Sequence, residues 1–217
     1  MSDAETHAPE PRWPALVAVL AVGVLNFLIP EQLTFGPAWA LMALIAAMAL
    51  PTMIFHQIGN HHLNEAFAYG GLAIITSALV GSLGLLVTRL PAHKDPPVEL
   101  LRAAAALWIA NILVFASWYW RLDGGGPNKR DKRRVHLDGA FLFPQMMMNP
   151  ELKERMGEEY WNPGFVDYLF LAFNTSTAFS PTDVPVLSRW AKVMMIVQSI
   201  ISLTTVALLA ARAVNIL

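Results

Sequence analysis

The chain has 217 residues, of which 55% are hydrophobic and 14% are charged, and its formal net charge is −1. Because about a quarter of the residues in a soluble domain are charged, this composition indicates an integral membrane protein in a lipid bilayer. The small net charge provides no basic field for nucleic acid, so we expect no nucleic-acid partner. The chain has no cysteine, which excludes disulfides, thiolate metal sites and a cysteine nucleophile.

The N-terminal residues 1–12 are polar and mildly acidic, and they lack the basic segment that begins a secretory signal. We interpret them as a disordered tail that precedes a single transmembrane domain at 13–217. Five apolar segments of this domain approach the length of about 20 residues that a helix needs to cross a bilayer, although the first is short. The sequence therefore predicts an all-α, multi-pass transmembrane helical bundle with spans at about 13–30, 37–55, 70–90, 98–120 and 185–217.

The last third of the chain contains a short apolar helix and a polar turn in addition to the last predicted span. A short apolar helix, expected at 165–173, leads into the polar residues 174–177 and a turn at 180–183, after which the final apolar segment begins. Irregular backbone is tolerated at membrane depth only where protein or water satisfies its polar groups. The pattern predicts a re-entrant hairpin at 165–184, and the alternative is that the short helix is a sixth, thin span.

Basic residues are concentrated in the polar segment 121–164, whereas the loops after the first two spans contain none. Because basic loops stay on the cytoplasmic side of a membrane, we expect this segment and the N-terminus to be cytoplasmic. Its basic cluster either contacts anionic lipid or a partner, or is only the ordinary signal of topology. The cluster consists of Lys129, Arg130, Lys132, Arg133 and Arg134.

The polar elbow of the hairpin is the first candidate site. Hydroxyl and amide groups at the end of a short helix can replace water around a small cation, with a carboxylate supplying charge. The alternative is that these groups bond to their own helix and that Asp183 is the N-cap of the last span. The candidate pore or ion-contact residues are Asn174, Thr175, Ser176, Thr177, Ser180, Thr182 and Asp183.

A second candidate is the group His56, His61, His62 and Glu65, predicted to lie in an interfacial loop between the second and third spans. Histidine and carboxylate side chains can hold zinc, and the alternative is that they are polar groups at the membrane surface. We expect no other cofactor. We also expect no enzymatic activity, because the sequence contains no paired carboxylates, phosphate-binding loop or nucleophile–base constellation.

Amide side chains lie within two predicted spans. Asn111 belongs to the fourth span, and Gln198 and Asn215 belong to the last. Such groups usually form hydrogen bonds between helices that contribute about 0.6 kcal/mol each. We therefore expect these amides to join neighbouring spans.

Several long motifs resemble a family of uncharacterised bacterial polytopic inner-membrane proteins. The resemblance covers 107–217, about half of the chain, and implies an inner-membrane location without implying an activity. It is carried by LWIANILVFASWYWRLDGGGP, FLFPQM, DYLFLAFNTSTAFSPTDVPVLSRWAKVMM and SLTTVALLAARAVNIL.

More faintly, the layout of 98–120, 165–173 and 185–217 resembles the outer, pore and inner helices of a potassium-channel pore module. In that family a threonine opens the selectivity filter, glycines fill it and an aspartate closes it. Here Thr177 and Asp183 flank Ala178-Phe179-Ser180-Pro181-Thr182, which contains no glycine. Successive inward carbonyls require glycine conformations, and proline fixes φ near −65°. The hairpin is therefore not a potassium filter.

Two functions remain as expectations. The first is a channel-like or transporter-like protein whose hairpin passes a small ion without selectivity for potassium. The second is a non-conducting accessory or scaffold subunit of a larger membrane complex. Both predict a homo-oligomer or a subunit of a membrane assembly, and the sequence alone does not decide between them.

Overall fold

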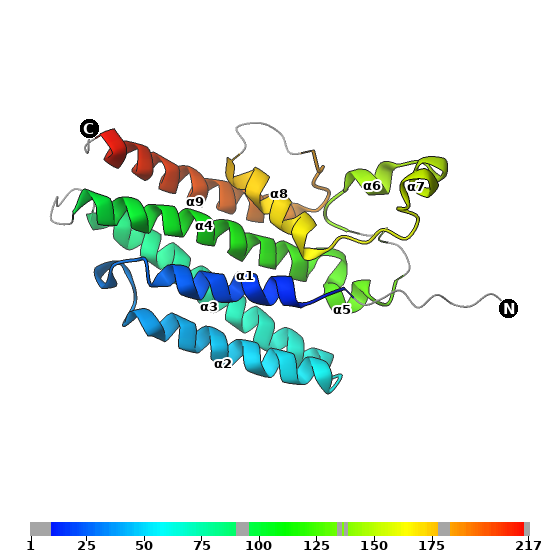
Figure 1. The fold of residues 1–217 in the computed structure, drawn as a ribbon, viewed down its shortest axis with the longest axis horizontal. Coiled ribbons are helices and arrows are strands. Elements are labelled where there is room, and N and C mark those ends of the chain that lie inside the picture. The colour runs from blue at the N-terminus through cyan, green and yellow to red at the C-terminus, as the bar shows by residue number, and fades with distance from the viewer. Residues whose placement is uncertain (1–9, 90–95, 134–135, 137–138, 178–182, 215–217) are drawn as a thin grey trace.

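Helices make up the regular structure of this protein, which confirms the predicted all-α class. The computed structural model describes residues 10–89, 96–133, 136, 139–177 and 183–214, and within these ranges the only β pairing is one isolated bridge (Figure 1). The elements are α1 (Trp13–Asn26), η1 (Glu31–Leu33), α2 (Ala38–Gln57), α3 (His61–Arg89), α4 (Pro97–Leu122), η3 (Asp123–Gly125), α5 (Pro127–Arg130), α6 (Pro144–Met147), α7 (Pro150–Met156), α8 (Phe165–Thr177) and α9 (Arg189–Val214).

Four helical segments are long and apolar enough to cross a membrane, namely 38–57, 61–89, 98–130 and 189–211. The first predicted span, 13–30, is helical only over the 14 residues of α1. At about 1.5 Å per residue this helix covers about 21 Å, which is less than the hydrocarbon core of about 30 Å. The described residues therefore contain four helices that are long and apolar enough to cross a membrane and a shorter apolar helix beside them, and the count of five spans stays a prediction.

Helix α4 is the central element of the bundle. It packs against α1, α3, α8 and α9, and Figure 1 shows it running between α1 and α9. Its first half contains the buried alanines Ala103, Ala104 and Ala106, whose small side chains let neighbouring helices approach closely. Its second half buries Phe115 and Tyr119, so that α4 contributes to most of the core.

The connection between α2 and α3 is a tight turn and not the predicted interfacial loop. Gly59 has a φ of +78° and lies just beyond the end of α2. The Asn60 side chain then accepts a hydrogen bond from the amide of Leu63 at 3.2 Å, which caps the start of α3. Because the two capping residues adjoin, α3 begins at His61, nine residues before the predicted start of the third span at Gly70.

The predicted hairpin has different boundaries in the structure. Helix α8 continues through the polar residues to Thr177, and the last helix begins at Arg189 and not at Pro185. Before α9, Val186 pairs with Phe141 of the 121–164 segment through an isolated antiparallel bridge. Phe141 is fully buried, so this part of the segment packs against the bundle.

Apolar side chains cover the outer faces of α2 and α9. Leu50 and Ile54 of α2 and Ile196 and Leu203 of α9 are each at least half exposed. Contiguous exposed apolar surface of this kind indicates contact with lipid or with another protein. It agrees with the membrane character predicted from the composition.

Three glycines with positive φ follow α4, and the third gives a testable requirement. Gly126 has a φ of 88° and a ψ of 169°, a conformation essentially confined to glycine, and a Cβ there would lie 2.7 Å from the carbonyl oxygen of Arg121. We expect Gly126→Ala to lower the free energy of unfolding by about 2–3 kcal/mol. Gly157 also has a positive φ, but its Cβ would meet no atom within 4 Å, so Gly157→Ala should cost only about 1 kcal/mol. Equal losses for the two variants in detergent-based unfolding would contradict this account.

Candidate functional site

A buried layer of polar side chains joins α4, α8 and α9. Gln198 lies at its centre and is fully buried. Its amide nitrogen donates to the Ala172 carbonyl at 2.7 Å and to the Ser176 hydroxyl at 2.8 Å, and its amide oxygen accepts from the Tyr119 hydroxyl. Asn111 donates to the Gln198 carbonyl at 3.1 Å.

The predicted role of Asn111 and Gln198 as links between spans is confirmed, and Asn215 lies outside the described residues.

The elbow residues that belong to α8 form their hydrogen bonds within the chain. Thr175 and Thr177 donate to carbonyls one turn earlier, at 2.8 and 2.9 Å. Ser176 is buried, and its carbonyl accepts a hydrogen bond from the Ser202 hydroxyl. These contacts match the alternative in which the polar groups satisfy the helix and its neighbours. Asn174 is half-buried on the same helix.

The remaining elbow residues do not join this layer. Asp183 is exposed and precedes the first residue of α9 by several positions. The predicted alternative for Asp183, an N-cap of the last span, is therefore wrong. Ser188 occupies that position and accepts a hydrogen bond from the Ala191 amide at 3.3 Å. Ser180 and Thr182 lie outside the described residues.

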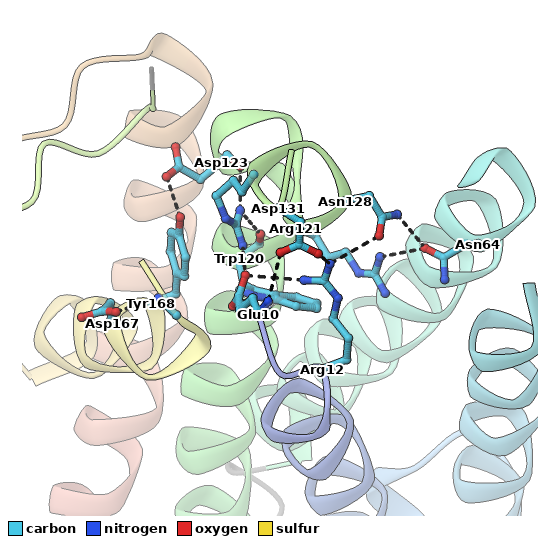
Figure 2. Close-up of polar contacts among 12 residues, drawn as sticks. Glu10, Arg12, Asn64, Trp120, Arg121, Asp123, Asn128, Asp131, Asp167 and Tyr168 are labelled. Carbon is cyan, nitrogen blue, oxygen red and sulfur yellow. Dashed lines mark hydrogen bonds and ion pairs between the residues drawn. The ribbon is translucent and has the colours of Figure 1, made fainter. Parts of the chain in front are cut away.

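A second polar network lies at the end of α4, where the chain turns through η3 into α5 (Figure 2). Asp123 is fully buried and accepts a hydrogen bond from the Tyr168 hydroxyl at 2.7 Å and another from the Ala140 amide. Its carboxylate also lies 3.3 Å from Nε2 of the buried His136. The Asp123 carboxylate therefore connects the end of α4 to Tyr168 of α8 and to His136 and Ala140 of the 121–164 segment.

Arg130 belongs to the same network, and its guanidinium lies over the face of the Tyr168 ring. Only 2% of Arg130 is exposed, and its guanidinium lies 5.2 Å from the ring centroid. It donates to the carbonyls of Trp120 and Asp123 at 2.8 Å each and pairs with Glu10 at 3.0 Å. These bonds replace the water that a buried guanidinium loses, and the Glu10 carboxylate neutralises its charge.

Glu10 and Arg12 belong to the folded structure, so the predicted disordered tail at 1–12 ends too late. Glu10 also accepts a hydrogen bond from the Trp120 indole, and Arg12 pairs with Asp131. Burial lowers the pKa of Arg12, whereas the carboxylates of Asp131 and Glu10 oppose this shift. Residues 1–9 lie outside the described part of the chain.

The residues of the predicted basic cluster differ in how far they are exposed to solvent. Arg130 is buried by the contacts described above, so its assignment to lipid or partner contact is wrong. Lys129 and Lys132 are exposed and Arg133 is half-buried, which leaves them accessible. Arg134 lies outside the described residues. The sequence pattern could not separate Arg130 from its neighbours, because its partner Glu10 is 120 positions away.

The histidine-rich stretch does not form a metal centre in the structure. No group of three or more histidine, cysteine, aspartate or glutamate side chains in the described residues is placed to hold a metal ion. His56 lies in the last turn of α2, and both His61 and His62 are exposed at the start of α3. Glu65 is half-buried one turn further along α3.

A cavity of about 130 Å³ lies among α1, α2, α3 and α4. Apolar side chains such as Ile45, Met48 and Ile75 line most of it, and Arg12, His56 and Arg121 lie among its polar lining residues. No motif in the sequence predicts this cavity. The only local signal was the sequence Trp-Tyr-Trp-Arg at 118–121, which places a cation directly after an aromatic belt.

No protein-family model, curated protein or solved structure matches the chain. The resemblance to bacterial inner-membrane proteins therefore stays a prediction. The function has to be inferred from the geometry of the site alone.

Proposed function

We propose that this chain is a non-conducting accessory or scaffold subunit of a larger membrane assembly. The main observation is that the hydroxyl groups of the elbow on α8 already form hydrogen bonds within the protein. Thr175, Ser176 and Thr177 use their hydroxyl groups within the chain, in contacts to their own helix or to Gln198 of α9. Polar groups that are already satisfied by protein are poor replacements for the water around an ion.

The 121–164 segment supplies a surface for a partner. Helices α6 and α7 stand beside the end of the bundle in Figure 1, and α7 has no buried residue. Leu152 and Met156 of α7 are 40% and 56% exposed, and charged side chains separate them. An apolar pair with a polar surround is typical of protein–protein contacts.

Affinity capture from native membranes tests this proposal. The tagged chain should retain a stoichiometric partner, and Leu152→Asp together with Met156→Asp should release it. Leu63→Asp is the control, because Leu63 is similarly exposed at 40% and lies in the first turn of α3, where an acidic residue is favoured. Capture of this chain alone, or release by the control variant, would contradict the proposal.

A second candidate function, passage of a small ion along the hairpin, is favoured by one observation. The 13-residue α8 is too short to span and packs against both α4 and α9, with its polar end beside them. Purified protein in liposomes tests it directly. The accessory function predicts no ion flux and no effect of Asp183→Asn, whereas flux that falls in Asp183→Asn would support permeation and overturn our proposal.

A further inference from the structure

The polar end of the four-helix cavity is positively charged. The residues that line the cavity include Arg12, Arg121 and His56 but no aspartate or glutamate. Figure 2 shows the side chains of Arg12, Arg121, Asn64 and Asn128 gathered at one end of the bundle. The charge of Arg12 is offset by Asp131 and Glu10. Among the two arginines that line the cavity, Arg121 is therefore the one without an ion pair within 4.0 Å in the described residues.

Arg121 has few partners for its donors. In the described part of the chain no carboxylate oxygen lies within 4.0 Å of its guanidinium, and its only side-chain hydrogen bond is to Asn64 Oδ1 at 3.3 Å. One face of the guanidinium lies 5.0 Å from the centroid of the Trp120 ring. A guanidinium carries five N–H donors in a planar fork, so most of them remain available to an anion at the cavity.

Two amides fix the geometry around this cation. Asn64 donates to the Thr52 carbonyl at 2.7 Å, and its oxygen accepts from both Arg121 and Asn128. The Asn64 oxygen is thereby oriented toward Arg121. Glu65 interacts with Arg121 electrostatically but forms no ion pair with it within 4.0 Å. An arginine that is held in place without a direct ion pair suits bidentate binding of a phosphate group.

The rest of the cavity is apolar and extends toward the middle of the bundle. Ala15, Ala49, Ala68 and Gly71 line it, and their small side chains leave space between α2 and the other helices. Met53 also lines the cavity and is 46% exposed, so the lining reaches the outer face of α2. An apolar cavity of about 150 Å³ can take up a benzene-sized guest, and this one is large enough for part of an acyl chain.

We propose that this cavity binds an anionic phospholipid, with the phosphate at Arg121 and the beginning of an acyl chain between α1, α2 and α3. The predicted orientation places Arg121 on the cytoplasmic side, where anionic lipids are concentrated. Free phosphate has no acyl chain for the apolar part of the cavity. A zwitterionic phosphatidylcholine brings a quaternary ammonium beside the cationic lining residues Arg12 and Arg121, so an anionic headgroup is favoured. The proposal does not depend on whether the chain has a protein partner.

Native mass spectrometry of the purified full-length protein tests the proposal. The protein is mixed with dioleoyl phosphatidylglycerol, with dioleoyl phosphatidylcholine, or with inorganic phosphate. We expect one phosphatidylglycerol to be retained per chain, and Arg121→Gln to weaken this retention about tenfold, which corresponds to a loss of about 1.4 kcal/mol. Lys132→Gln is the matched control, because it removes an equal charge from an exposed position outside the cavity.

A second variant keeps the test valid if Arg121→Gln does not fold. Ala68→Leu leaves both arginines in place and adds volume to the apolar part, so it should exclude the acyl chain and abolish retention. Equal retention of the two lipids, or equal effects of Arg121→Gln and Lys132→Gln, would overturn the proposal. Retention of phosphate as strong as that of phosphatidylglycerol, or undiminished lipid retention in Ala68→Leu, would overturn the role of the acyl chain and so the lipid assignment.

Discussion

Asp123→Ala is expected to lower the free energy of unfolding by about 3–5 kcal/mol, because at least two buried donors lose their acceptor at once. The Asp123 carboxylate is fully buried and faces His136 at 3.3 Å. The Tyr168 hydroxyl and the Ala140 amide would also lose their acceptor. A buried donor that loses its acceptor adds about 1–3 kcal/mol to the cost, so this variant should have one of the largest effects in the chain.

Thermal and denaturant unfolding in a mild detergent measure this effect. Asp131→Ala is the control, because the Asp131 side chain reaches solvent, at 21% exposed, although it pairs with Arg12 in the neighbouring part of the same network. Exposed ion pairs contribute up to about 1 kcal/mol. If the two variants lost similar stability, Asp123 would not be the organising group of the network.

The second large effect is expected for Gln198→Leu. Leucine fills a similar volume but leaves the buried Tyr119 hydroxyl without its acceptor, and it removes the hydrogen bonds of Gln198 to the Ser176 hydroxyl and the Ala172 carbonyl. We expect a loss of about 2–4 kcal/mol, because three buried hydrogen bonds are lost at once and the Tyr119 hydroxyl becomes unsatisfied. The same unfolding measurements apply.

Two further variants separate this network effect from simple packing. Ser199→Ala removes one long hydrogen bond, of 3.5 Å, from the same helix and should change stability by less than about 0.5 kcal/mol. Tyr119→Phe combined with Gln198→Leu should cost less than the sum of the two single variants, because the unpaired hydroxyl is gone. Strict additivity would show that Gln198 and Tyr119 act independently.

The sequence predicted some features of the site better than others. The amides Asn111 and Gln198 were identified as links between spans because a polar group within an apolar helix has few alternatives. The turn at Gly59 and Asn60 was missed, although a glycine followed by an asparagine is a local signal for the end of one helix and the start of the next. The extent of α8 was missed because threonine and serine are poor helix formers until their hydroxyls bond to the helix itself.

The sequence by itself determined that this is an all-helical protein with long apolar helices, because helix length and hydropathy are properties of single segments. It could not determine which polar groups meet. Only the tertiary structure decided that Glu10 neutralises Arg130, that the elbow on α8 bonds to Gln198, and that Arg121 lies at a cavity whose lining residues include no carboxylate. The two contacts join different segments of the chain, and the cavity lies among four helices. The energies of such contacts depend on burial, which no single segment encodes.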